Sequence, residues 1–124
     1  MRNDKRTVVD LTAAGATQGD LLAVNGHLLD SGGATIGGFH LDAAVVATTR
    51  VREVRATNAY ISWKDSPDSL VFSGAPEFPA GGGLPTGPIR FAVVGGTGQY
   101  AGAGGQATVT FEKPNIFRWA IELK

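Results

Sequence analysis

The sequence predicts an all-β fold: a single eight-stranded antiparallel β-barrel in which residues 1–124 form one domain. Its apolar runs alternate with period 2 or are β-branched, as in half-buried strands. Eighteen glycines and six prolines interrupt these runs at the intervals expected of turns. No segment keeps the apolar spacing of an amphipathic helix for three turns. Because a closed barrel has no exposed strand edges, these short strands favour closure over an open sheet.

The expected strands lie at residues 6–13, 20–29, 34–47, 50–63, 69–75, 88–95, 104–113 and 115–123. Most are separated by short segments rich in Gly, Ser, Asp, Asn or Pro, which are typical of tight turns. These turns lie at residues 15–19, 30–33, 64–68 and 113–115. A barrel of eight strands has room inside for its own side chains or for one small ligand.

The segment 91–105, Phe-Ala-Val-Val-Gly-Gly-Thr-Gly-Gln-Tyr-Ala-Gly-Ala-Gly-Gly, connects two of these strands. It contains a match to the dinucleotide fingerprint G-x-G-x-x-A, which needs a helix to begin at the glycines. Gly102, Gly104 and Gly105 oppose a helix there, and a period-2 pattern begins at once. We therefore expect a tight connection between antiparallel strands and no nucleotide cofactor.

The composition of the chain limits the kinds of partner and cofactor that it is expected to bind. Eleven basic and eleven acidic residues give no net charge, which argues against nucleic acid or an anionic membrane surface. There is no cysteine for disulfide or thiolate chemistry. His27 and His40 lie in different expected strands without a carboxylate cluster, so no metal site is expected. The charged N-terminal residues 1–6 lead into a strand, and we expect a cytoplasmic protein with no signal peptide, membrane helix or cofactor.

Four segments carry a resemblance to a known family: Gly19-Asp-Leu-Leu-Ala-Val-Asn25, Ile36-Gly-Gly38, Leu70-Val-Phe-Ser-Gly74 and the segment 91–105. In this order they resemble the allene oxide cyclase barrel superfamily, which includes dirigent proteins and, more distantly, bacterial spirotetronate cyclases. The similarity covers nearly the whole chain from about residue 6. It implies an eight-stranded barrel, usually oligomeric, that holds an apolar substrate in its lumen.

The first expected strand carries the candidate catalytic residues Asp10 and Thr12. In the allene oxide cyclases the corresponding strand has an inward Glu followed two residues later by an Asn, and Asp10 and Thr12 occupy these positions. The allene oxide cyclases also have a cysteine in the apolar wall of the lumen. The corresponding position of this chain lies near Ala43, and there is no cysteine there. A carboxylate facing an apolar lumen has a raised pKa and can act as a general acid or stabilise a developing cation. The alternative is an outward Asp10 on a solvated face, with Val9 and Leu11 in the core.

The alternation of side chains between the two faces of the strand 50–63 suggests further polar site residues. One face carries Val54, Ala56, Asn58 and Tyr60, and the other carries Glu53, Arg55, Thr57 and Ala59. The second face is more charged, so we expect Asn58 and Tyr60 to point inward, Tyr60 as a catalytic candidate and Asn58 in substrate binding. Alternatively, they form a satisfied buried network with each other or with Asp10. Family members often carry an Asn near the lumen, and Asn25 occupies this place.

The expected apolar lining of the lumen is largely aromatic. It comprises Phe39, Leu41, Phe91, Val93, Phe117, Trp119 and Ile121. The Pro- and Gly-rich segment 75–88 is longer than a hairpin needs, and loops of this length are often functional. Phe78 and Leu84 are expected to cover one mouth of the barrel, with residues 81–83 as a hinge. The alternative is a simple surface excursion.

Two function classes remain open. The first is a cofactor-independent cyclase or isomerase that folds an apolar polyketide- or lipid-like precursor into a reactive conformer. The second is a dirigent-like binding protein that steers an intermediate made elsewhere. In either case the partner is a small apolar organic molecule. Several strands are apolar on both faces, for example at Val45 and Val46, so we also expect a homo-oligomer, a dimer or trimer.

Overall fold

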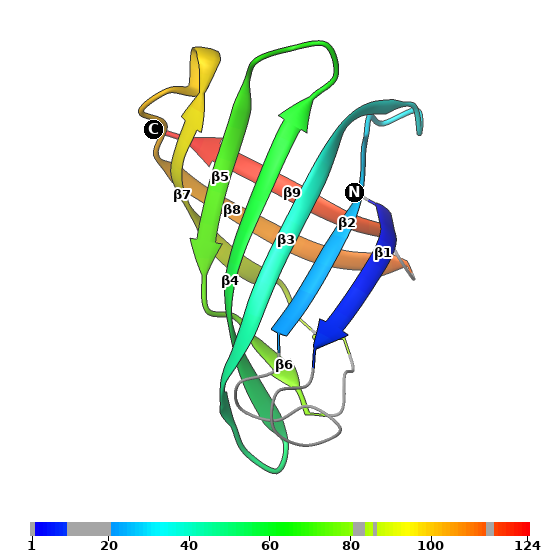
Figure 1. Cartoon of the computed structure of the whole chain (residues 1–124), viewed down its shortest axis with the longest axis vertical. Helices are drawn as coiled ribbons and strands as arrows, with labels where there is room; N and C mark the ends of the chain where they lie inside the picture. The colour runs from blue at the N-terminus through cyan, green and yellow to red at the C-terminus, as the bar shows by residue number, and fades with distance from the viewer. Residues whose placement is uncertain (1, 10–20, 81–83, 86, 114–115) are drawn as a thin grey trace.

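The structure, a computed structural model, describes residues 2–9, 21–80, 84–85, 87–113 and 116–124 (Figure 1). These residues form one curled antiparallel sheet, so the predicted all-β class is confirmed. A single 3-10 turn, η1 (Gly98–Tyr100), is the one helical element in the described ranges. The strands are β1 (Arg2–Val9), β2 (Leu21–Leu29), β3 (Thr35–Thr48), β4 (Arg52–Trp63), β5 (Ser69–Gly74), β6 (Glu77–Pro79), β7 (Ile89–Thr97), β8 (Gly105–Lys113) and β9 (Ile116–Leu123).

The strand pairings run around a ring of eight strands. Neighbours follow the order β3-β2-β1-β9-β8-β7-β5-β4, and β4 pairs with β3 to return to the start. The pairing of β3 with β4 is long, whereas β1 and β9 share a single pair, Arg2 with Ile116. The sheet is therefore strongly curled, and in the part of the chain that the structure describes a narrow seam joins β1 to β9.

Seven of the predicted strands agree with the observed ones to within two residues at each end. The first strand differs, because β1 already begins at Arg2. The sequence reading also missed β6, a short strand that follows Pro76 and ends at Pro79, because two prolines so close together indicate a loop. The start of β4 extends past the end of β5 and leaves an open edge, on which Arg52, Glu53 and Val54 pair with β6. Proline is tolerated on such an outer strand.

Alternate residues of β4, β5 and β7 point into the curl and contribute to the core. Phe72, Ile61 and Leu70 are the largest fully buried apolar side chains, and they come from β4 and β5. A second, smaller cluster is formed by Leu22, Ala43 and Val45 from β2 and β3. Burying a side chain of this size contributes about 1.5–3 kcal/mol, so these inward rows stabilise the curl.

The glycine-rich connection closes one end of the barrel. As expected, it joins antiparallel strands, β7 and β8, and η1 follows the glycines where a dinucleotide site needs an α-helix. Trp63 stacks on Tyr100 of η1, with ring centroids 5.0 Å apart. Both carboxylate oxygens of Asp68 accept hydrogen bonds from Gln99, at 3.0 Å from its backbone N–H and 2.6 Å from its side-chain amide. These contacts fasten the β4–β5 turn to η1.

Candidate functional site

A cavity of about 120 Å³ lies inside the barrel, in the half away from the glycine-rich connection. Its wall is mostly aliphatic and aromatic. It is formed by Leu22, Val24, Phe39, Leu41, Ala43, Arg55, Thr57, Phe78, Leu84, Ile89, Phe91, Val109, Phe111, Phe117 and Trp119. An apolar cavity of roughly 150 Å³ is known to stay dry and to bind benzene. The space therefore suits one ring or a short branched chain, and a larger molecule would extend toward the mouth.

The floor of the cavity is an aromatic cluster around Trp119. The indole stacks on Phe91 with a centroid distance of 5.4 Å and an interplanar angle of 5°. Phe72, which does not line the cavity itself, contacts the same indole edge-on, with ring centroids 5.1 Å apart. Contacts of this kind contribute about 0.5–1.5 kcal/mol each beyond burial, and they fix the orientation of Trp119. The floor is thus a rigid flat surface on which an apolar ring can lie.

One wall of the cavity carries charge. Glu53 is 1% exposed, and its Oε1 accepts hydrogen bonds from Nε of Arg55 at 2.8 Å and from Nη2 of the same residue. The buried Thr57 donates its hydroxyl proton to the backbone carbonyl of Arg55 at 2.9 Å. The side chain of Arg55 is 11% exposed and lines the cavity. The other carboxylate oxygen of Glu53, Oε2, is buried and has no hydrogen-bond partner within the described ranges.

The segment after β5 covers the mouth of this cavity. Phe78 of β6 lies against Arg55, with the guanidinium carbon 4.0 Å from the ring centroid, and Leu84 also reaches the cavity. The backbone N–H of Arg55 donates to the carbonyl of Pro76 at 3.0 Å. The segment therefore packs directly on the charged wall rather than projecting away from it.

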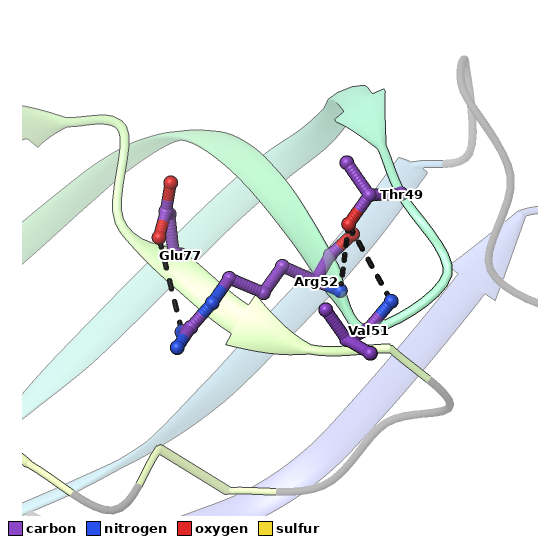
Figure 2. Close-up of polar contacts among 4 residues, drawn as sticks. All are labelled: Thr49, Val51, Arg52 and Glu77. Carbon is purple, nitrogen blue, oxygen red and sulfur yellow. Dashed lines mark hydrogen bonds and ion pairs between the residues drawn. The ribbon is translucent and has the colours of Figure 1, made fainter.

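The β3–β4 turn supports this cover from outside (Figure 2). The Thr49 hydroxyl accepts hydrogen bonds from the backbone N–H groups of Val51 and Arg52, at 3.4 Å and 3.1 Å. The Arg52 side chain then reaches across to Glu77 of β6, with a closest N–O distance of 3.8 Å. Because both side chains are well exposed, this ion pair contributes little to stability, and β6 is held mainly by its backbone pairing with β4.

Several predicted site residues lie on the cavity wall. The expected lining residues Phe39, Leu41, Phe91, Phe117 and Trp119 are part of it, as are Phe78 and Leu84. Val93 and Ile121 pack in or against the core cluster beside it. Asp10 and Thr12 lie outside the described residues, so their expected position in the lumen stays a prediction.

The expected inward direction of Asn58, Tyr60 and Asn25 is wrong. All three are exposed on the outer face, Tyr60 to 40%, while Thr57 and Ala59 of the same strand point inward. The charged start of β4 suggested a solvent face, but Glu53 and Arg55 neutralise each other inside the barrel. On β2 the inward-facing residue is one position earlier than expected, so Val24 lines the cavity in place of Asn25.

Sequence reasoning therefore missed the buried pair Glu53–Arg55. A signal was present in the second half of the same strand, where Ala59, Ile61 and Trp63 alternate with Asn58, Tyr60 and Ser62. The apolar set belongs inside, and period 2 carries the same face back to Glu53 and Arg55. Opposite charges two residues apart on a strand share a face and are able to pair there.

Two further features bear on the kind of site. Within the described ranges, no group of three or more His, Asp or Glu side chains is placed to hold a metal ion. The same ranges contain no helix with the length and apolar character needed to cross a membrane.

Comparison with known proteins places the fold. No protein-family model matches the sequence, and no curated protein matches it. A solved structure has the same fold. It is that of a protein named pyocyanin demethylase, with a TM-score of 0.81 over 99% of this chain and 94% of the other. At 20% sequence identity, this similarity establishes the curled all-β architecture and leaves the activity open.

Proposed function

We propose that the protein is a cofactor-independent cyclase or isomerase that folds a small apolar precursor inside the barrel. The observation that carries this proposal is the cavity itself, an apolar space with an aromatic floor at Trp119 and one charged wall at Arg55. Such a space holds an apolar molecule in few conformers. Holding reacting groups in position can lower a barrier by roughly 7–11 kcal/mol in the best cases.

Chemistry at one or two points completes the proposal. Asp10 is proposed as the acid or the stabilising negative charge, in keeping with the position it shares with the inward Glu of the allene oxide cyclases. Losing a positioned acid typically costs about 10²–10⁴ in rate, so Asp10→Asn is expected to reduce turnover by that factor. The fold shared with pyocyanin demethylase supports an enzyme, although that name describes a different reaction.

A dirigent-like binding protein is the second candidate. It is favoured by the composition of the described wall, where Arg55 and Thr57 are the polar side chains besides the indole N–H of Trp119. Arg55 is already paired with Glu53, and Thr57 already donates its proton to a backbone carbonyl. A wall of this kind orients a ligand well but offers little proton transfer by itself.

The mass of the product separates these candidates. The protein is incubated with a panel of polyenones, epoxides and phenolic ketones, and products are separated by chromatography and weighed by mass spectrometry. A cyclase or isomerase gives a new compound of unchanged mass, and Ala43→Phe, which fills the cavity, abolishes it. Binding without conversion of any compound would favour the dirigent-like candidate. A product lighter by one methylene group would instead indicate demethylation.

A further inference from the structure

Within the described ranges, Arg55 has hydrogen-bond donors that its contacts do not use. A guanidinium has five N–H donors, and Glu53 Oε1 takes one from Nε and one from Nη2. No further acceptor for this guanidinium is found in the described part of the chain. The guanidinium carbon lies over the ring of Phe78, 4.0 Å from its centroid, and this contact with an aromatic face uses no hydrogen-bond acceptor. Because Arg55 lines the cavity, these remaining donors are available to a molecule inside it.

The charge balance of the wall limits what that molecule carries. The positive charge of Arg55 is already matched by Glu53, which is 1% exposed and has a second carboxylate oxygen without a partner in the described ranges. A carboxylate brought to Arg55 would lie close to this buried anion, and like charges in such a site repel strongly. A neutral acceptor, such as a carbonyl oxygen, gains the charge-assisted hydrogen bond without that repulsion.

The order of residues along β4 indicates how a ligand is oriented in the cavity. From the covered mouth inward, the inner face carries Glu53, Arg55 and Thr57, and then Ala59 and Ile61. β6 pairs with the first part of this strand, at Arg52–Val54, whereas Phe72, which contacts Trp119, pairs with Ala59 further along it. A ligand with one polar end and one apolar ring therefore fits with its polar end at the mouth.

We propose that Arg55 binds the carbonyl oxygen of a neutral, ring-sized ketone or lactone whose apolar ring lies on Trp119, and that Glu53 is the positioning residue for Arg55. This rests on the proposed function of the lumen and names its substrate class.

Three probes of nearly the same shape test the assignment: acetophenone, its hydrocarbon isostere α-methylstyrene, and benzoate. Dissociation constants are measured by NMR titration of the wild-type protein. A hydrogen bond to a charged group is worth enough to give acetophenone roughly 10- to 100-fold tighter binding than α-methylstyrene. Benzoate is expected to bind more weakly than acetophenone.

Variants assign this selectivity to the pair. The double variant Glu53→Leu/Arg55→Met removes both charges together and is expected to bind acetophenone and α-methylstyrene about equally. Glu53→Gln leaves Arg55 with an unmatched charge, so the preference should change from acetophenone to benzoate, which a purely structural role of Glu53 would not produce. Arg90→Met, an exposed arginine on β7, is the matched control and should keep the wild-type order.

The outcomes separate this inference from the proposed function. Equal wild-type affinity for acetophenone and α-methylstyrene would overturn the carbonyl assignment and leave a lumen that binds apolar rings. Tighter binding of benzoate would overturn the charge argument. Failure of all three probes to bind would reject the lumen as a small-molecule site and this inference with it. The wild-type series decides among these outcomes even where a variant fails to fold.

Discussion

The guanidinium of Arg55 packs over the ring of Phe78, with the guanidinium carbon 4.0 Å from the ring centroid. This contact joins the charged wall of the cavity to the strand that covers its mouth. Since such contacts contribute about 0.5–2 kcal/mol, Phe78→Leu should lower the free energy of unfolding by about 0.5–1 kcal/mol in urea titrations, and Phe78→Ala by more. Val51→Ala, at a 70% exposed neighbouring position, should change it by less than about 0.5 kcal/mol. A Phe78→Ala protein as stable as the wild type would show that the contact does not hold β6.

The ion pair inside the barrel should show strong coupling. Arg55→Met alone leaves the buried Glu53 carboxylate unmatched, which typically costs about 3–5 kcal/mol. Glu53→Leu/Arg55→Met removes both charges and keeps the volume, so its stability should be near that of the wild type or above it. Urea unfolding of the single and double variants measures the difference. A double variant as unstable as Arg55→Met would contradict a mutually neutralised pair.

Gly98 is one of the glycines that the closed end of the barrel requires. Its φ is +64°, and a Cβ there would lie 1.9 Å from Oδ1 of Asp68. Gly98→Ala should therefore lower the free energy of unfolding by about 1–3 kcal/mol, through backbone strain and loss of the Asp68–Gln99 contact. Gly87→Ala is the control, since nothing lies within 4 Å of a Cβ at that position. Equal effects of the two substitutions would contradict the described turn.

Asp68 should make stability depend on pH. The backbone N–H of Gln99, and then its side-chain amide, lower the pKa of Asp68 below its usual 3.8. A lowered folded-state pKa contributes stability that is present above the unfolded value and is lost as pH falls through the folded value. The stability advantage of wild type over Asp68→Asn should thus hold at pH 6 and decline below about pH 4. Parallel pH profiles of thermal unfolding for the two proteins would contradict this.

The outer face of the barrel is expected to form a homo-oligomer. Val46, Val94 and Leu123 are between 45% and 57% exposed on three different strands. Contiguous apolar patches on a protein surface often mark interfaces between subunits, and we expect these residues to contribute to one. Light scattering at micromolar concentration should give a dimer or trimer, and a mass near 12.8 kDa would contradict the expectation.

The fold was more predictable from the sequence than the site. Period-2 alternation and glycine spacing located seven strands to within two residues, because both reflect local backbone requirements. The site depends on which face of β4 points inward. The sequence analysis assigned the two faces the wrong way round, with Asn58 and Tyr60 inside and Glu53 and Arg55 outside. Charge suggests a solvent face, but a strand residue can be buried if its partner two positions away neutralises it. The strand β6 depends on an open edge of β4 that only the register of β5 creates.

The central claim is that the barrel holds a small organic molecule on its aromatic floor, and one titration tests it most directly. Acetophenone is titrated into wild type, into Ala43→Phe, which fills the cavity from β3, and into Ala120→Phe, which places the same ring on an exposed position beside Trp119. Circular dichroism confirms beforehand that all three proteins keep the same β signal. One molecule should bind per chain in the wild type and in Ala120→Phe, and none in Ala43→Phe. Unchanged binding by Ala43→Phe, or none by the wild type, would contradict the account.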